Sequence, residues 1–214
     1  FVFSLGFKAQ GPSGYEFMPW FVSALVPWIF LSSALSNITS SVSRNLHIVT
    51  KTNYPSEFFP IVCLLAEIYT HFIFMIILII FLYFYGIMVP ENFFQILIFF
   101  IYGIIIILGL GYFLSALNIF STDVSHGLTI IINIFFWFTP IVWHLSIIPE
   151  KYLFLIKWNP VYYFVEGYRH ILLFGGGSRV SLYEHSVMWL VGIALLSLSF
   201  SFFSRVKGRF VDLV

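Results

Sequence analysis

The 214-residue chain has very few charged residues. Asp, Glu, Lys and Arg together make up 9% of it, against about 25% in soluble globular domains. Hydrophobic residues make up 60% of the sequence, and the mean hydropathy is +1.00. So little polar surface cannot cover a soluble core. The composition therefore excludes a soluble globular domain and predicts an integral membrane protein.

Other features are scarce or missing. The net charge is +1 and no basic stripe occurs, so we expect no nucleic-acid partner. Cys63 is the only cysteine, which excludes an internal disulfide and a cysteine metal site. The chain has no Gly-Lys pair and hence no Walker A phosphate loop, and it has no H-E-x-x-H or G-x-S-x-G motif. We predict no catalytic residue, no metal ion and no cofactor on this chain.

Long apolar runs are abundant, and a run of about 20 residues is enough for a transmembrane helix. Residues 1–7 are apolar but too few to span, and we expect them to be the outer end of a span that starts before this sequence. We predict an all-α fold with one domain over residues 1–214. It is a polytopic transmembrane helix bundle with the end of a first span and five complete spans, over residues 17–43, 58–88, 93–120, 127–148 and 183–203.

Two short helices are predicted between the last two spans. Pro149 and Asn159-Pro160 are typical of helix starts, and the glycine run that begins at Gly175 is typical of a helix end. The resulting helices, over 152–158 and 161–174, are too short to cross a membrane. They form either an amphipathic pair at the membrane interface or a re-entrant pair that lines a water-filled cavity.

The second short helix has an amphipathic pattern. Apolar residues recur at helical spacing from Val161 to Leu172. Tyr162, Glu166 and Arg169 fall on the opposite side with His170, and Glu166 can reach Arg169 along the helix. The surrounding aromatic residues form either an interfacial belt or stacking surfaces for sugar rings: Trp137, Trp143, Tyr152, Trp158, Tyr162, Tyr163 and Tyr168.

Two ionisable residues, Glu67 and His71, lie inside the predicted span 58–88. An ionisable residue within a span is a candidate functional residue, because it must face the bundle interior or water. The structural alternative is a polar contact, either between the two side chains or with Tyr69 or the serines of a neighbouring helix.

The segment 44–57 is the most polar internal part of the chain. Arg44, His47 and Lys51 are spaced so that one short helix would present them on a single face. Either this is a cytoplasmic loop with the usual excess of basic residues, or it is a docking surface for a cytoplasmic partner.

The orientation in the membrane follows from Lys and Arg placement. These residues number five on each side, so the count alone does not decide. The dense C-terminal cluster of Arg205, Lys207 and Arg209 follows the last span directly. We therefore expect the C-terminus to be cytoplasmic and the two short helices to lie outside.

Several stretches resemble the membrane subunit of polysaccharide-exporting ABC transporters, the group that exports O-antigen, teichoic acid and capsule chains. They are L-V-P-W-I-F-L-S-S-A-L (25–35), K-T-N-Y-P-S-E-F-F-P (51–60), F-F-W-F-T-P-I-V-W (135–143), N-P-V-Y-Y-F-V-E-G-Y-R (159–169) and F-S-R-V-K-G-R-F-V-D-L-V (203–214). The resemblance covers nearly the whole chain in the same order.

The resemblance implies a homodimer of this subunit that works with two copies of a cytoplasmic ATP-binding subunit, which would hold ATP and Mg. It also implies a multi-pass protein of the bacterial inner membrane whose N-terminal interface helix, with most of its first span, lies outside this sequence. Arg44, His47 and Lys51 would couple to the ATPase. The two short helices would be outer gate helices along the substrate path, with Trp137, Tyr152, Trp158, Tyr162, Tyr163, Glu166 and Arg169.

The expected function is ATP-driven export of a lipid-linked polysaccharide, O-antigen-like, by a transport subunit that is not itself an enzyme. Two alternatives stay open at this point. One is an exporter of drugs or small lipids with the same fold. The other is a membrane-embedded transferase or a secondary transporter, in which Glu67 and His71 would be catalytic or proton-carrying.

Overall fold

The computed structural model describes residues 16–52, 54–175 and 181–210. Within these ranges every regular element is a helix, which confirms the all-α prediction. Residues 1–7, predicted to end an earlier span, lie outside the described residues. The elements are α1 (Phe17–Thr39), α2 (Ser41–Arg44), α3 (Leu46–Lys51), α4 (Phe58–Phe84), η2 (Phe93–Gln95), α5 (Ile96–Phe120), α6 (Asp123–Phe138), η3 (Leu145–Ile147), α7 (Glu150–Lys157), α8 (Pro160–Phe174), α9 (Leu182–Val206) and η4 (Lys207–Arg209).

Four helical segments in the described residues are long and apolar enough to cross a membrane. They are α1, α4, the segment formed by η2 and α5, and the segment formed by α9 and η4. The bounds predicted for the remaining span, 127–148, are wrong. Helix α6 has 16 residues and ends at Phe138, so it is about 24 Å long against a hydrocarbon core of about 30 Å. It ends there because Thr139 precedes a proline and is extended, with φ −83° and ψ 133°.

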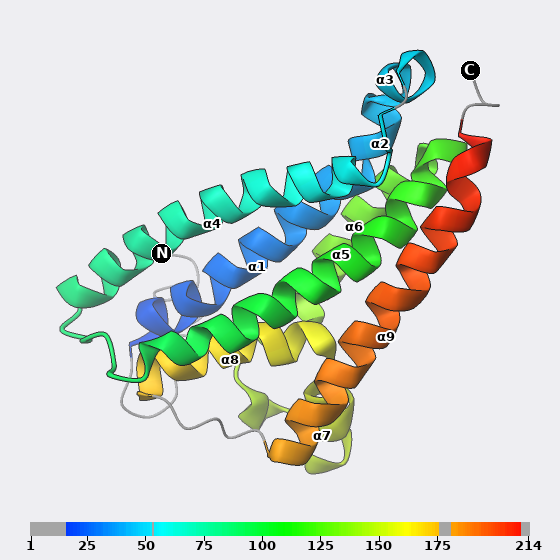
Figure 1. Cartoon of the computed structure of the whole chain (residues 1–214). Helices are drawn as coiled ribbons and strands as arrows, with labels where there is room; N and C mark the ends of the chain where they lie inside the picture. Colours follow the sequence, from blue (N-terminus) through cyan, green and yellow to red (C-terminus); the bar gives the residue numbers. More distant parts are fainter. Residues whose placement is uncertain (1–15, 53, 176–180, 211–214) are drawn as a thin grey trace.

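Helices α1 and α5 form the centre of the bundle. Helix α1 packs against α4, α5 and α8, and α5 packs against α8 and α9. Helices α4 and α9 lie on the two flanks (Figure 1). The buried residues of α4 recur at helical spacing along one stripe, from Pro60 to Leu82, while side chains such as Phe72 and Ile76 are exposed on its other faces. Such an apolar outer surface suits contact with lipid.

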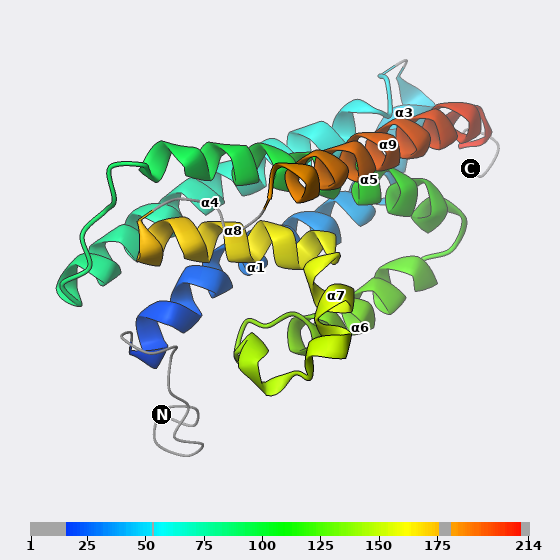
Figure 2. The same ribbon diagram turned by 90° about the horizontal axis from the view of Figure 1, so that it is seen from below.

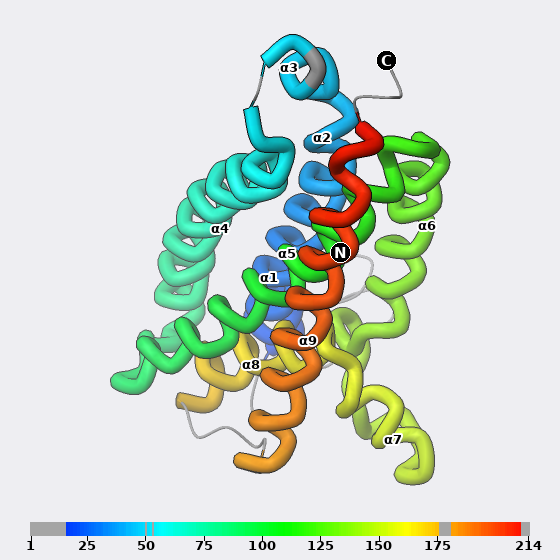
Figure 3. Tube along the Cα trace, turned by 45° about the vertical axis from the view of Figure 1, so that its right-hand side comes forward, coloured from blue at the N-terminus to red at the C-terminus, as the bar shows by residue number. Residues whose placement is uncertain are grey.

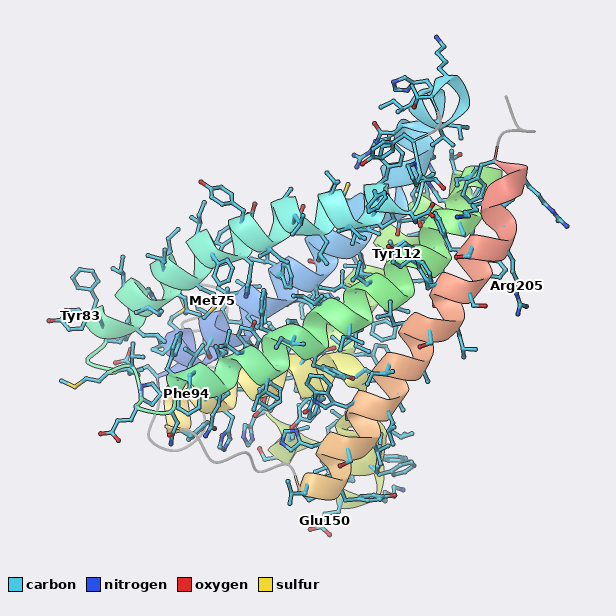
Figure 4. The ribbon with its side chains drawn as sticks, viewed as in Figure 1. Met75, Tyr83, Phe94, Tyr112, Glu150 and Arg205 are labelled. Atoms are coloured by element: carbon cyan, nitrogen blue, oxygen red, sulfur yellow. The ribbon has the colours of Figure 1, made fainter. Side chains whose placement is uncertain are left out.

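Different helices lie at the two ends of the molecule. Helices α2 and α3 gather at one end with the last turns of α9, and this is called the α3 end below (Figure 3). Helix α7 and the first turns of α9 lie at the other, called the α7 end. Arg205 and Glu150 mark these opposite ends in Figure 4. Helix α8 lies across α1, as the view from below shows (Figure 2).

Glycine allows α8 to approach α5 closely. A Cβ atom built on Gly103 of α5 would lie 2.4 Å from the ring of Phe164. One built on Gly167 of α8 would lie 2.1 Å from the ring of Phe99. Each helix thus has a glycine where the other places an aromatic ring, and neither position has room for a larger residue.

The predicted boundaries of the short helices are confirmed within two residues. Pro149 precedes α7, and Asn159 caps α8 by accepting a hydrogen bond from the Val161 amide. Pro160 occupies the first position of α8, where its missing N–H costs nothing. Gly175 ends α8 in the left-handed conformation, with φ 75°.

Candidate functional site

A cavity of about 500 Å³ lies at the α7 end. Its walls come from α1, from the turn after α6, and from α7, α8 and α9. The residues that line it are Trp20, Pro140, Trp143, His144, Leu145, Ser146, Ile148, Glu150, Leu153, Lys157, Tyr162, Tyr163, Glu166, Arg169, Glu184 and Met188. Its volume falls in the range of about 300–1,000 Å³ that is usual for small-molecule sites.

Arg169 holds the inner wall of this cavity together. Its guanidinium donates to the carbonyl oxygens of Trp20 at 3.2 Å, Pro140 at 2.9 Å and Ile141 at 3.1 Å. It also donates to Glu166 Oε2 at 2.8 Å. The guanidinium carbon lies 3.9 Å from the centre of the Trp20 ring, a cation–π contact. One side chain thus joins α8, the first turn of α1 and the turn after α6.

This network has a clear physical cause. The Pro140 turn interrupts helical hydrogen bonding, and both Pro140 and Ile141 are buried, so their carbonyl oxygens need donors. A guanidinium offers five N–H groups in a planar fork. Arg169 lies on the same side of α8 as Glu166, as the helical spacing predicts, but that side is covered by the protein, because only 1% of Arg169 is exposed.

The burial of α8 also rules out an amphipathic helix lying on the surface. The predicted apolar side is confirmed, since all its members from Val161 to Leu172 are buried. Tyr163, Gly167 and Arg169 are buried as well, so the protein covers more than one face of α8. The burial of α8 agrees with the alternative in which the short helices line a cavity, while α7 has no buried residue.

The predicted path residues divide into two groups. Tyr162, Tyr163, Glu166 and Arg169 line the cavity, and the hydroxyl of Tyr163 hydrogen-bonds to Nδ1 of His185 on α9. The other three do not line it and have exposed side chains: Trp137, Tyr152 and Trp158.

Sequence reasoning missed several lining residues, among them Glu150, Lys157 and Glu184, whereas Trp143 was among the aromatic residues considered as stacking surfaces. One of them had a readable signal. Ser181 and Glu184 form a capping box at the start of α9, and S-x-x-E is the pattern for that motif. The pattern places Glu184 in the first turn of α9 but says nothing of the cavity beside it.

Glu67 contacts α1 and not His71. Ser33 Oγ donates to Glu67 Oε2 at 2.8 Å, and Asn37 Nδ2 donates to Glu67 Oε1. The carboxylate therefore links α4 to α1 through two hydrogen bonds. This is the contact with a neighbouring helix that the structural alternative described.

His71 lies on the same helix as Glu67 but contacts α8. Its Nε2 is 3.2 Å from the hydroxyl of Tyr168, and its ring stacks on Phe30 with centroids 4.5 Å apart. Nδ1 of His71 is buried and has no hydrogen-bond partner in the part of the chain that the structure describes. The pair thus joins the flanking helix α4 to α8.

The basic residues at the α3 end lie on two helices. Arg44 ends α2, whereas His47 and Lys51 belong to α3, because the chain breaks at Asn45 with φ −110° and ψ 17°. The expected single helix with all three residues on one face is therefore wrong. All three are exposed, and Arg44 turns back to donate to the carbonyl oxygen of Asn37 at 3.2 Å.

An ion pair holds the two chain segments of the α3 end together. Lys207 Nζ at the end of α9 lies 2.7 Å from Glu57 Oε1, just before α4. Partial burial alone would raise the pKa of the Glu57 carboxyl, but the hydrogen bond and charge of Lys207 outweigh this and hold that pKa below its ordinary value.

Several helical segments in the described residues that are long and apolar enough to cross a membrane indicate a multi-pass membrane protein. The sequence matches the ABC-2 type transporter family over residues 1–173. The chain therefore belongs to that family, as a membrane permease subunit, which confirms the resemblance noted from its motifs. Permeases of this family are transport subunits without catalytic activity of their own, and they pair with an ATP-binding subunit.

Two curated relatives extend the match to the whole chain. Both are named O-antigen export system permease protein RfbA and come from Klebsiella pneumoniae. They are 28% identical to this chain over 224 and 217 aligned residues. Each alignment covers 100% of this chain and 81% of the relative.

Proposed function

We propose that the chain is the transmembrane subunit of an ATP-driven exporter that moves a lipid-linked, O-antigen-like polysaccharide across the bacterial inner membrane. The observation that carries this proposal is the alignment of the whole chain with two O-antigen export permeases. The carboxylates that line the cavity at the α7 end support it, because an exporter of small apolar lipids or drugs has less need of charged groups there.

In the proposed assembly two copies of this subunit form a homodimer with two ATP-binding subunits, which hold ATP and Mg. The α3 end faces the cytoplasm with the C-terminus, and the exposed Arg44, His47 and Lys51 dock on the ATPase. Helices α7 and α8 then lie at the outer exit of the path. Closure of the ATPase pushes α2 and α3, and the push reaches α1 directly because α2 follows it after one residue.

Complementation tests the substrate class. The full-length protein and its partner ATPase are introduced into a strain that lacks its O-antigen export permease and ATPase, and surface glycan is measured. We expect glycan to return to the surface. Surface glycan that stays absent, with both proteins inserted and assembled, would contradict the proposal.

Charge reversal tests the docking surface. In the purified complex, the double substitution Arg44→Glu with Lys51→Glu should abolish transport-coupled ATPase activity while membrane insertion is retained, because it places two anions where the partner meets two cations. The matched control is Lys151→Glu, an exposed cation at the opposite end. Coupling that survives the double reversal would rule out this docking surface.

The substitution Glu67→Gln tests ATP-driven transport against a proton-driven carrier. Glu67 accepts hydrogen bonds from Ser33 and Asn37, and a glutamine oxygen can still accept one of them. We expect Glu67→Gln to lower stability while export continues. Complete loss of export from a stable, assembled protein would favour a proton relay at Glu67.

A further inference from the structure

The cavity at the α7 end has a mixed polar and aromatic lining. Three carboxylates line it, those of Glu150, Glu166 and Glu184, together with the amine of Lys157. Hydroxyl groups come from Ser146, Tyr162 and Tyr163. Trp143 contributes an indole that is only half-buried. The wall therefore offers hydrogen-bond acceptors, donors and aromatic surface within one space.

This chemistry excludes two classes of ligand. An anionic group such as a phosphate would meet the carboxylates of Glu150 and Glu184. Glu166 and Arg169 already form an ion pair, and Arg169 also donates to three carbonyl oxygens. A purely apolar ligand such as an acyl chain would cover carboxylates without offering them hydrogen bonds, which is costly.

The lining suits a polyhydroxylated ring. Sugar hydroxyls both donate and accept, so they can satisfy carboxylates, the amine and tyrosine hydroxyls at the same time. The C–H face of a sugar ring can lie against an aromatic side chain such as Trp143 or Tyr162. A volume of about 500 Å³ accommodates a short part of a glycan and not a whole chain.

We propose that this cavity is a saccharide-binding site in each protomer, which holds a short stretch of the exported glycan beside the exit. The inference rests on the proposed function and adds a defined binding site to it. The wall formed by α8 and the Pro140 turn is fixed by Arg169, whereas Glu150 and Lys157 come from α7, of whose described residues none is buried. Helix α7 is therefore the less firmly packed part of the wall.

A binding measurement tests the site in the purified full-length complex. The probe is the repeat-unit oligosaccharide released by mild acid from the glycan that the wild-type protein exports. Binding is followed by calorimetry and by the change in total tryptophan fluorescence, since two of the six tryptophans, Trp20 and Trp143, line the cavity. We expect saturable binding to the wild type and at least tenfold weaker binding to Tyr162→Ala, which removes a ring and a hydroxyl from the wall.

A matched control is Tyr183→Ala, which removes an exposed tyrosine at the same end that does not line the cavity. It should bind the oligosaccharide as the wild type does. If Tyr162→Ala fails to fold, Tyr162→Phe replaces it, and we expect about threefold weaker binding through loss of the hydroxyl alone. Equal binding by the wild type and the Tyr162 variant would overturn the inference.

Glutamine substitutions separate a sugar site from a cation site. In Glu150→Gln with Glu184→Gln, a sugar keeps hydrogen-bond partners, and the capping box tolerates glutamine. We expect the oligosaccharide to bind within about fivefold of the wild type. A cation site would give a different result: the wild type would bind tetraphenylphosphonium but not the oligosaccharide, and the double variant would no longer bind tetraphenylphosphonium. This result would overturn the inference.

The failure of the inference differs from that of the proposed function. If the wild type restores no surface glycan, the proposed function is wrong and the saccharide site falls with it. If the wild type exports glycan but its purified complex does not bind the oligosaccharide, only the saccharide site is wrong.

Discussion

The two short helices at the α7 end are attached to the bundle in different ways. Helix α8 is packed against α1 and α5, and ten of its described residues are buried. Helix α7 has eight residues, all described, and none of them is buried. Both helices line the cavity, but α8 is packed into the bundle whereas α7 lies on its surface.

The difference arises mainly from two kinds of contact. Arg169 ties α8 to three backbone carbonyl oxygens on other segments, and Gly167 lets α8 approach α5. Moving α8 alone would leave a buried guanidinium without partners, which costs several kcal/mol. Moving α7 exposes little that was buried. Low-cost motion at this end therefore belongs to α7.

The largest expected effect is that of Arg169→Ala. It leaves Glu166 and the carbonyl oxygens of Trp20, Pro140 and Ile141 without their donor. We expect the free energy of unfolding to fall by about 3–5 kcal/mol. Denaturant unfolding of the purified protein in detergent measures it.

The control for this substitution is Lys157→Ala on α7. Lys157 is exposed, so its loss should change the free energy of unfolding by less than about 0.5 kcal/mol. Equal destabilisation by the two substitutions would remove the distinction between α7 and α8.

Local sequence signals predicted the bounds of α7 and α8 well. Pro149, Asn159-Pro160 and Gly175 act on the backbone of their own neighbourhood, and the helices begin and end beside them. The end of α6 is also set by a local signal, the proline at position 140, but the prediction of the span 127–148 did not use it. Pro140 stands inside a long apolar run, and hydropathy hid the helix end that proline enforces.

The place of Arg169 could not be predicted in this way. Helical periodicity assigns a residue to a face of its own helix, and it placed Arg169 beside Glu166, which the ion pair confirms. It cannot show that the carbonyl oxygens of Trp20 and Pro140 meet that face. Those contacts join residues far apart in the chain, and only the packed bundle brings them together.

A smaller effect is expected for Gly167→Ala. The new Cβ atom would lie 2.1 Å from the Phe99 ring, and that ring is itself buried beside Tyr163. Overpacking of this kind costs about 1–3 kcal/mol, although alanine is otherwise better than glycine in a helix by up to about 1 kcal/mol. Unfolding should therefore show a net loss of stability.

The control is Gly127→Ala in α6, where nothing lies within 4 Å of the new Cβ atom among the described residues. Without a clash only helix propensity acts, so we expect this variant to be as stable as the wild type or up to about 1 kcal/mol more stable. If Gly167→Ala instead stabilises the protein, α8 can shift away from α5, and this would contradict the idea that α8 is fixed in its place.

The smallest effect compares one hydroxyl group on each helix. Tyr168→Phe removes the partner of His71 Nε2, at 3.2 Å, inside the bundle. Hydrogen bonds between helices in a membrane protein average about 0.6 kcal/mol, so we expect a loss of about 0.5–1.5 kcal/mol. Tyr152→Phe on α7 removes a hydroxyl from a side chain that is 48% exposed, and water can replace what is lost there. If both substitutions lower the free energy of unfolding by the same amount, the hydroxyl of Tyr168 does not stabilise the contact between α4 and α8. Packing alone would then hold α8 in its place.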